Sequence, residues 1–181
     1  MDVDFLLRLN DEDFVKLYEN LNLANIIKKY KYEKNNESFL LACDRGHLEV
    51  IKYLISLPKK YKIDPSINNN LAIQKSSHRG HLEVVKYLIS LPKRYKIDPS
   101  AYDNNTILLA CKFGHLDIVK YLISLPEKYG IDPSAMNNYA IRFASKDRHL
   151  DVVNYLMSLP KEYGINHAFA YIHNPGYQKF K

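Results

Sequence analysis

Histidine and cysteine are the residue types in this chain that could support catalysis, and both occur at regular intervals. Cys43 lies four residues before His47, and Cys111 lies four residues before His115. On a helix this spacing would place a thiol beside a base, as a cysteine nucleophile requires. The sequence supplies no third group to orient either pair, and a repeated segment would produce the same spacing by itself. We therefore predict that the chain is not an enzyme.

The seven histidines also raise the question of a metal site. Zinc needs three or four ligands at bonding distance, and the sequence contains neither Cys-x-x-Cys nor His-Glu-x-x-His. It also contains no glycine-rich phosphate loop. Four of the histidines are spaced 34 residues apart, which would spread them along the molecule: His47, His81, His115 and His149. We expect a structural role for these four, and we predict no metal and no cofactor.

The four histidines mark an internal repeat, because each opens a nearly identical segment: HLEVIKYLISLP, HLEVVKYLISLP, HLDIVKYLISLP and HLDVVNYLMSLP. In the first of these segments, Leu48, Ile51, Leu54 and Ile55 have the spacing of one helix face. Pro58 cannot continue the helix, so it marks the end. This pattern predicts one short helix in every copy.

A preceding helix is predicted from 37 to 45, with Asn36 as its N-cap and Gly46 as its left-handed C-cap. In the fourth copy Arg148 takes the place of this glycine, at a cost of about 1 kcal/mol. The segment that joins one copy to the next holds two prolines and several asparagines in the first copy. It is therefore predicted to be loop and turn.

Neither helix can bury its apolar face alone, so neighbouring copies must stack into a linear array. Small side chains on the first helix would let adjacent helices approach closely, and they form a column: Cys43, Ser77, Cys111 and Ser145. Two copies separate the cysteines, so we expect no disulfide between them. The predicted fold is all-α, a solenoid of stacked helix-turn-helix units.

The residues GHLEVVKYL at 80–88 resemble the second helix of the ankyrin repeat. Ala42-Cys43 before Gly46-His47 likewise resembles the small pair that precedes that family's Gly-His turn. The resemblance covers residues 35 to 165, and copies such as NNYAIRFASKDRHLDVVNYL are similar to the divergent ankyrin repeats abundant in mimivirus-like giant DNA viruses. It implies an ankyrin-repeat solenoid with short turn-rich fingers that binds a protein partner without catalysis, and a host protein if the chain is viral.

The first helices lack the Thr-Pro-Leu-His opening of the family. We expect the missing hydrogen bonds to come from an asparagine column: Asn36, Asn70, Asn104 and Asn138. The linker after the second helix is longer than usual and the finger is shorter, so the first helix should be the better contact surface. One variable column on that helix is Leu40, Gln74, Leu108 and Arg142. The resemblance places nine variable residues on the recognition side: His78, Arg79, Tyr102, Lys112, Phe113, Met136, Tyr139, Lys146 and Asp147.

The repeats divide the chain into four ankyrin-like units at 36–165, an N-terminal helical cap or degenerate repeat at 1–35 and a C-terminal cap at 166–181. The stretch FLLRLNDEDFVKLYENL in the first segment has a faint similarity to an F-box opening helix, so a ubiquitin-ligase adaptor is an alternative function. We expect a monomer.

Composition and charge fit a soluble protein. Of 181 residues, 46% are hydrophobic and 25% charged, which excludes a disordered chain. No apolar run is long enough to span a membrane, and no export signal is visible. Two cysteines fit a reducing compartment, so we expect a cytoplasmic protein, in the host cytoplasm if it is viral.

A weak nucleic-acid binder is the second alternative. The net charge of +6 arises mainly in the linkers PKKYK and PKRYK, where basic residues alternate with Tyr61 and Tyr95. Such a pattern could hold phosphates and stack bases. The later copies PEKYG and PKEYG keep the tyrosine and lose the charge. We therefore predict that the tyrosines are structural and that a protein partner is favoured over nucleic acid.

Overall fold

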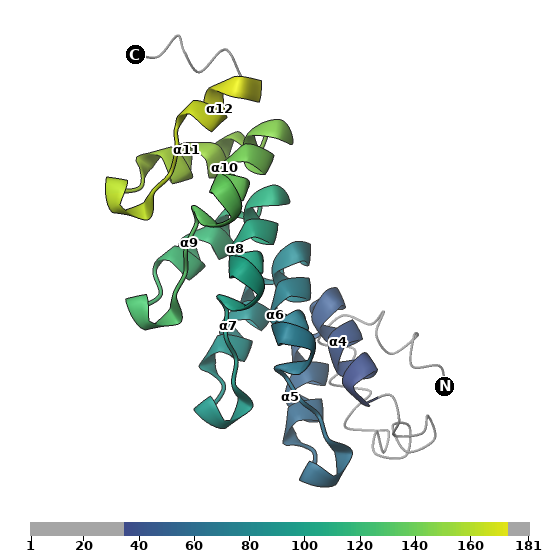
Figure 1. The fold of residues 1–181 in the computed structure, drawn as a ribbon. Helices are drawn as coiled ribbons and strands as arrows, with labels where there is room; N and C mark the ends of the chain where they lie inside the picture. The colour runs from purple at the N-terminus through teal and green to yellow at the C-terminus, as the bar shows by residue number, and fades with distance from the viewer. Residues whose placement is uncertain (1–34, 174–181) are drawn as a thin grey trace.

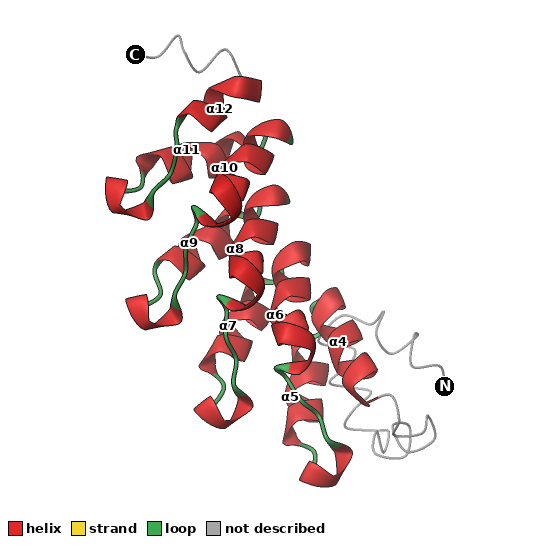
Figure 2. Cartoon of the chain, in the orientation of Figure 1, coloured by secondary structure: helices red, strands yellow, loops and turns green. Residues whose placement is uncertain are grey.

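The computed structural model of the chain describes residues 35–173, which fold into two alternating sets of helices. The first helices of the units are α4 (Asn35–Arg45), α6 (Ile67–Arg79), α8 (Ala101–Lys112), α10 (Ala135–Lys146) and α12 (Ala168–His173). The second helices are α5 (Leu48–Ser56), α7 (Leu82–Ser90), α9 (Leu116–Ile123) and α11 (Leu150–Ser158). The linkers contain short 3-10 turns: η2 (Lys59–Tyr61), η3 (Lys93–Tyr95), η4 (Glu127–Tyr129) and η5 (Lys161–Tyr163). Figure 2 shows only helix and loop in this part of the chain.

Each first helix packs against the first helix of the next unit, from α4 through α6, α8 and α10 to α12. The second helices form a parallel row behind them, and the linkers project from that row on one side of the array (Figure 1). The predicted all-α solenoid of stacked units is therefore confirmed. No helix within residues 35–173 is long and apolar enough to cross a bilayer.

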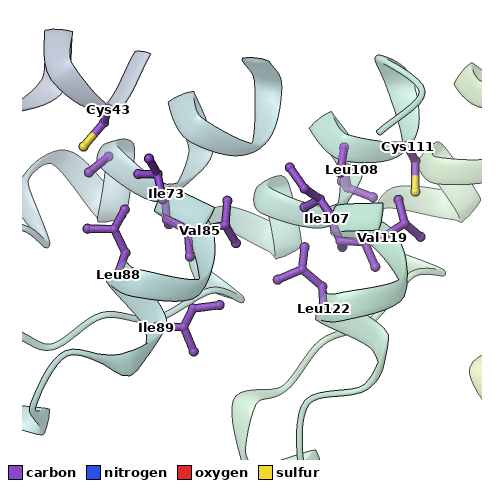
Figure 3. Close-up of a cluster of buried hydrophobic side chains, with 14 of the residues drawn as sticks. Cys43, Ile73, Val85, Leu88, Ile89, Ile107, Leu108, Cys111, Val119 and Leu122 are labelled. Atoms are coloured by element: carbon purple, nitrogen blue, oxygen red, sulfur yellow. The ribbon is translucent and has the colours of Figure 1, made fainter. Parts of the chain in front are cut away.

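The core runs without interruption along the array because every unit contributes the same apolar positions. Ile73 from α6 and Val85 and Leu88 from α7 are fully buried, and Figure 3 shows the equivalent side chains Ile107, Val119 and Leu122 one unit further on. In the first unit the second helix also buries Val50, which the predicted face did not include. The shared core makes each unit depend on its neighbours.

The column of small residues is completely buried, as the stacking required. Ser77 Oγ donates to the carbonyl oxygen of Thr106 in the next unit at 2.7 Å, and Ser145 Oγ donates to that of Ala170 at 3.0 Å. Cys43 and Cys111 are free thiols, and burial raises the pKa of Cys43 to about 12 and that of Cys111 further. Both thiols therefore stay protonated at neutral pH, which removes the nucleophile that the Cys-His spacing suggested.

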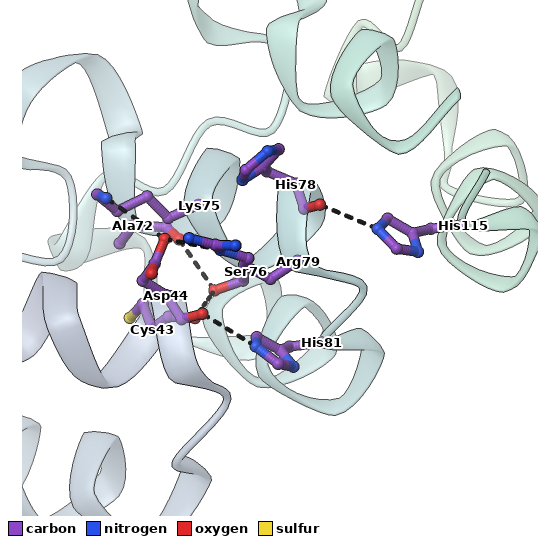
Figure 4. A network of polar contacts seen from close by, with 9 residues as sticks. All are labelled: Cys43, Asp44, Ala72, Lys75, Ser76, His78, Arg79, His81 and His115. Carbon is purple, nitrogen blue, oxygen red and sulfur yellow. Dashed lines mark hydrogen bonds and ion pairs between the residues drawn. The ribbon is translucent and has the colours of Figure 1, made fainter. Parts of the chain in front are cut away.

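The histidine column joins each unit to the one before it. The ring of His81 lies over Gly46, so close that a Cβ on this glycine would come within 2.5 Å of Nδ1. Nε2 of the same ring lies 3.0 Å from the carbonyl oxygen of Asp44, and Nε2 of His115 lies 2.9 Å from that of His78 (Figure 4). The histidines therefore satisfy carbonyl groups at the ends of the first helices, the structural role that the sequence predicted.

Arg148 adopts the left-handed conformation that was predicted for it, with φ of 63°. The three equivalent glycines each lie beneath the histidine of the following unit. An arginine at this position carries the left-handed backbone strain that glycine avoids.

The asparagine column does not cap its own helices, which corrects the N-cap prediction for Asn36. Oδ1 of Asn36 accepts a hydrogen bond from the backbone N–H of Asp64 at 2.9 Å, across 28 residues. The same bond, at 2.8 to 3.0 Å, recurs in three further pairs: Asn70 with Asp98, Asn104 with Asp132, and Asn138 with Asn166. The column thus ties each first helix to the linker that follows it, supplying bonds between units in place of the absent Thr-Pro-Leu-His.

At the beginning of α6, α8 and α10 the backbone makes one left-handed turn. Asn68, Asn69 and Asn70 have φ between 51° and 62°, and two later units have the same turn at 102–104 and 136–138. These turns are compact, as the predicted blunted fingers required. Asparagine tolerates this conformation better than most residues because its short side chain can hydrogen-bond locally.

Residues 166–173 continue the row of first helices. Ala170 on α12 is fully buried, and α12 packs against α10. The cap proposed for 166–181 remains a prediction. The cap at 1–35 and its F-box-like stretch lie outside the described residues, apart from Asn35.

The core predicts a large stability difference between two substitutions. Leu88→Ala should lower the free energy of unfolding by about 2–5 kcal/mol, because it opens a cavity at a fully buried position. Phe113→Ala should cost about 1 kcal/mol or less, because that ring is 39% exposed. Urea denaturation of both variants would measure this difference, and near-equal losses would contradict the assignment of faces.

The histidine–glycine contact predicts opposite effects at equivalent positions. Gly80→Ala should destabilise the fold, because its Cβ would lie 2.7 Å from Cε1 of His115 and its φ is +81°. Arg148→Gly should instead stabilise it by about 1 kcal/mol, since the left-handed strain is relieved. Thermal melting monitored by circular dichroism tests both, and a neutral Gly80→Ala would show that the contact is not close.

Candidate functional site

The nine predicted binding residues fall into two groups on the first helices. Tyr102 and Met136 lie in the left-handed turns, at the beginning of α8 and α10. The other seven lie further along α6, α8 and α10 or directly after them: His78, Arg79, Lys112, Phe113, Tyr139, Lys146 and Asp147. None of the nine is buried. Tyr139 lies directly after the turn that contains Met136, and the other six lie at the C-terminal ends of α6, α8 and α10.

Aromatic rings and cations from three units contact one another along the second group. The imidazole of His78 meets the ring of Phe113 edge to face, with centroids 4.2 Å apart. Lys112 Nζ lies 5.4 Å from the ring centroids of both Phe113 and Phe143, which makes it a bridge between the units. We call the following residues the aromatic strip: His78, Lys112, Phe113, Tyr139, Phe143 and Lys146.

Phe143 is central to the aromatic strip, and the sequence prediction missed it. Its ring stacks on that of Tyr139 with centroids 3.9 Å apart, and Lys146 Nζ lies 5.5 Å from its centroid. The equivalent positions in the other units are Leu41, Lys75 and Leu109, so the column varies in chemical type. That variation was the signal in the sequence that could have identified Phe143.

A charged cluster continues the surface toward α4 (Figure 4). Asp44 Oδ1 lies 3.4 Å from Lys75 Nζ and 3.3 Å from Arg79 Nε. Burial of Asp44 opposes its ionisation, but the hydrogen bond from Arg79 and the positive charges of Lys75 and Arg79 outweigh this, so its pKa lies below the usual value. Arg79, a predicted binding residue, is thus already paired with an acid of the neighbouring unit.

The turn group is the most exposed apolar part of the predicted surface. The side chain of Tyr102 is 67% exposed and that of Met136 is 55% exposed. Both residues have positive φ, 57° and 53°, at the position that Asn68 occupies in α6. Neither tyrosine nor methionine favours this conformation, and neither is held there by burial.

The variable column at Leu40, Gln74, Leu108 and Arg142 is not part of an exposed surface, contrary to the expectation for variable positions. Gln74 and Leu108 are buried, and the other two are partly buried. Gln74 Nε2 donates to the carbonyl oxygen of Asn69 at 2.6 Å, and Asn105 Nδ2 donates to Gln74 Oε1 at 2.8 Å. This column varies because its members pack differently between units.

The basic linkers place cations over their own tyrosines. Arg94 Cζ lies 4.9 Å from the ring centroid of Tyr95, and Lys60 Nζ lies 5.2 Å from that of Tyr61. A cation over one ring face leaves that face unable to stack on a base. Residues 35–173 contain no cluster of three or more histidine, cysteine or acidic side chains that could hold a metal ion.

Comparison with protein families agrees with this architecture. The family model described as "Ankyrin repeats (3 copies)" matches residues 8–103 and 93–167. The chain belongs to the ankyrin-repeat family. A comparison with curated proteins found no match. Ankyrin repeats generally mediate protein–protein interaction, and the proteins that carry them are typically non-catalytic.

The environment of His78 in this ankyrin array predicts a measurable titration. Burial lowers the pKa of His78, and the nearby charge of Arg79 lowers it further. An NMR titration of the histidines should place the His78 pKa below the ordinary value. In Phe113→Ala the pKa should rise, because removing the ring exposes the imidazole to water. An unchanged pKa in this variant would contradict the contact between the two rings.

Proposed function

We propose that this ankyrin array binds another protein through the aromatic strip together with Tyr102 and Met136, and that it has no catalytic role. The observation that carries the proposal is the conformation of Tyr102 and Met136. Both are large apolar residues, exposed to solvent, in a left-handed turn where α6 has Asn68. Exposed strain of this kind opposes folding, so a function that uses the side chains accounts for it.

The aromatic strip supports the same function. Phe113 is partly exposed, and its ring is held by His78 on one side and Lys112 on the other. Rings fixed in this way lose little side-chain entropy when a partner covers them. Large aromatic residues of this type contribute most to the energy of protein interfaces.

The partner is proposed to be a host protein, with the chain itself a viral protein that acts as a monomer in the host cytoplasm. The similarity of the fourth copy, NNYAIRFASKDRHLDVVNYL, to the ankyrin repeats of giant DNA viruses supports this origin. The alternative function, a ubiquitin-ligase adaptor, depends on residues 1–35, which lie outside the described residues apart from Asn35. A pull-down of the ligase subunit that receives F-boxes, with and without these residues, would separate the two functions.

The proposal predicts that two substitutions strengthen the fold and weaken binding. Tyr102→Asn and Met136→Asn together should raise the free energy of unfolding by about 1 kcal/mol, because asparagine tolerates left-handed backbone better. Affinity capture from amoebal lysate, quantified by mass spectrometry, should show loss of the proteins retained by the unmodified chain.

Ile172→Asn is the matched control, because it also removes an exposed apolar side chain but lies on α12, which carries none of the residues of the proposed surface. Captured proteins should be retained by this control. If the Tyr102→Asn/Met136→Asn variant and the Phe113→Ala variant each retain these proteins as well as the unmodified chain does, the proposed surface is wrong.

A further inference from the structure

The linkers form a second surface. One groove lies between the first and second linkers, and another lies between the second and third linkers. The first groove, of about 330 Å³, is lined among others by Lys59, Lys62 and Ile63 of one linker and by Arg94 and Tyr95 of the next. The second groove, of about 470 Å³, has the equivalent lining one unit further on: Lys93, Lys96, Ile97, Lys128 and Tyr129. The array thus repeats one binding geometry at the interval of one unit.

The charge in both grooves is unbalanced. Each groove has three cations and one acid in its lining, Asp64 in the first and Asp98 in the second. Asp64 Oδ1 accepts hydrogen bonds from the backbone N–H and the hydroxyl of Ser66 at 3.0 and 2.8 Å, and Asp98 is held by Ser100 in the same way. Within residues 35–173, none of the six cations forms an ion pair.

Backbone strain gives an independent reason to assign a function to these cations. Lys62 and Lys96 have φ of 51° and 52°, in the left-handed region. The third and fourth linkers have Gly130 and Gly164 at the same position, where glycine adopts this conformation without strain. The first two linkers therefore retain an exposed lysine at a position where glycine would favour the fold.

Between the third and fourth linkers, acidic side chains replace two of the three cations that line each groove. Glu127, Gly130 and Glu162 occupy the positions that Lys59, Lys62 and Arg94 occupy in the first groove. The cationic surface consequently ends after two grooves. A ligand that carries negative charge would be aligned along the first three linkers and repelled by the fourth.

We propose that the two grooves bind an extended acidic segment of a partner protein whose carboxylates recur at every third residue. Neighbouring units of such an array are about 8–10 Å apart. An extended chain in the polyproline II conformation has three residues per turn and advances about 3.1 Å per residue, so it presents every third side chain on one face at close to the interval of one unit. Arg94 and Lys128 cover one face of Tyr95 and Tyr129 at 4.9 and 5.3 Å. This arrangement presents the cations to a carboxylate and hinders stacking by a nucleobase. The surface is separate from the aromatic strip and does not rest on the function proposed for it.

Fluorescence anisotropy with the full 181-residue chain tests the proposal. The probe is a labelled twelve-residue peptide with glutamate at every third position and glycine and serine between. A second peptide has the same composition with its glutamates consecutive, and a thymidine oligonucleotide of twelve bases provides the nucleic-acid comparison. The spaced peptide should bind most tightly of the three, with an affinity that falls as salt is raised.

The test variant is Lys62→Gly/Lys96→Gly, which removes two cations and also relieves strain. It should bind the spaced peptide about fivefold more weakly and melt at or above the temperature of the unmodified chain. Lys161→Gly removes a cation of the fourth linker and Phe113→Ala alters the aromatic strip, so both should bind the peptide normally. Loss of peptide binding in Phe113→Ala would mean that the two surfaces are not separate.

Three results would overturn the proposal. The first is equal or tighter binding of the peptide with consecutive glutamates, which would remove the spacing argument. The second is unchanged peptide binding by Lys62→Gly/Lys96→Gly. The third is tighter binding of the oligonucleotide than of the spaced peptide, which would identify a nucleic-acid surface instead.

Discussion

Three histidines of the repeat can occupy their places only because the preceding unit has a glycine, with no Cβ, beneath each ring. The rings of His81, His115 and His149 lie over Gly46, Gly80 and Gly114, and the first two also meet carbonyl oxygens at the ends of the first helices. Glycine supplies both the left-handed turn and the space, so one residue type meets two requirements. The distance between units, and with it the shared core, depends on this contact.

Hydrogen bonds between polar groups also join neighbouring units. An asparagine near the beginning of α4, α6, α8 and α10 accepts a hydrogen bond from the linker that follows, at 2.8 to 3.0 Å, and a serine on α6 and α10 donates one to the next first helix. These bonds satisfy backbone groups that would otherwise lie unpaired between helices. The asparagine column that forms these bonds is constant in four units, whereas the exposed positions of Tyr102 and Phe113 carry a different residue type in other units. Strain concentrates at exposed residues such as Tyr102 and Lys96, where it serves recognition in both of our proposals.

Sequence reasoning succeeded where a residue acts through its local helix and failed where it acts on another unit. The apolar spacing located the second helix of each copy, and Gly46 and Arg148, which follow first helices, adopt the predicted left-handed conformation. Asn36 has the residue type of an N-cap, yet its side chain bonds to Asp64, 28 residues away. Gln74 varied like a surface residue and proved to be buried, whereas Phe143 lay in a column that the prediction did not consider.

The sequence alone determined every feature that depends on spacing along the chain. These features are the repeat period, the helices, the small buried column and the membership of the ankyrin family. The tertiary structure alone decided which variable columns face solvent, which cations stand over which rings and where the linkers leave grooves. His78 and Phe113, or Arg94 and Lys62, are 35 and 32 positions apart in the chain and come together only when the units stack. Their contacts depend on the rotation and spacing of whole units, which no local pattern specifies.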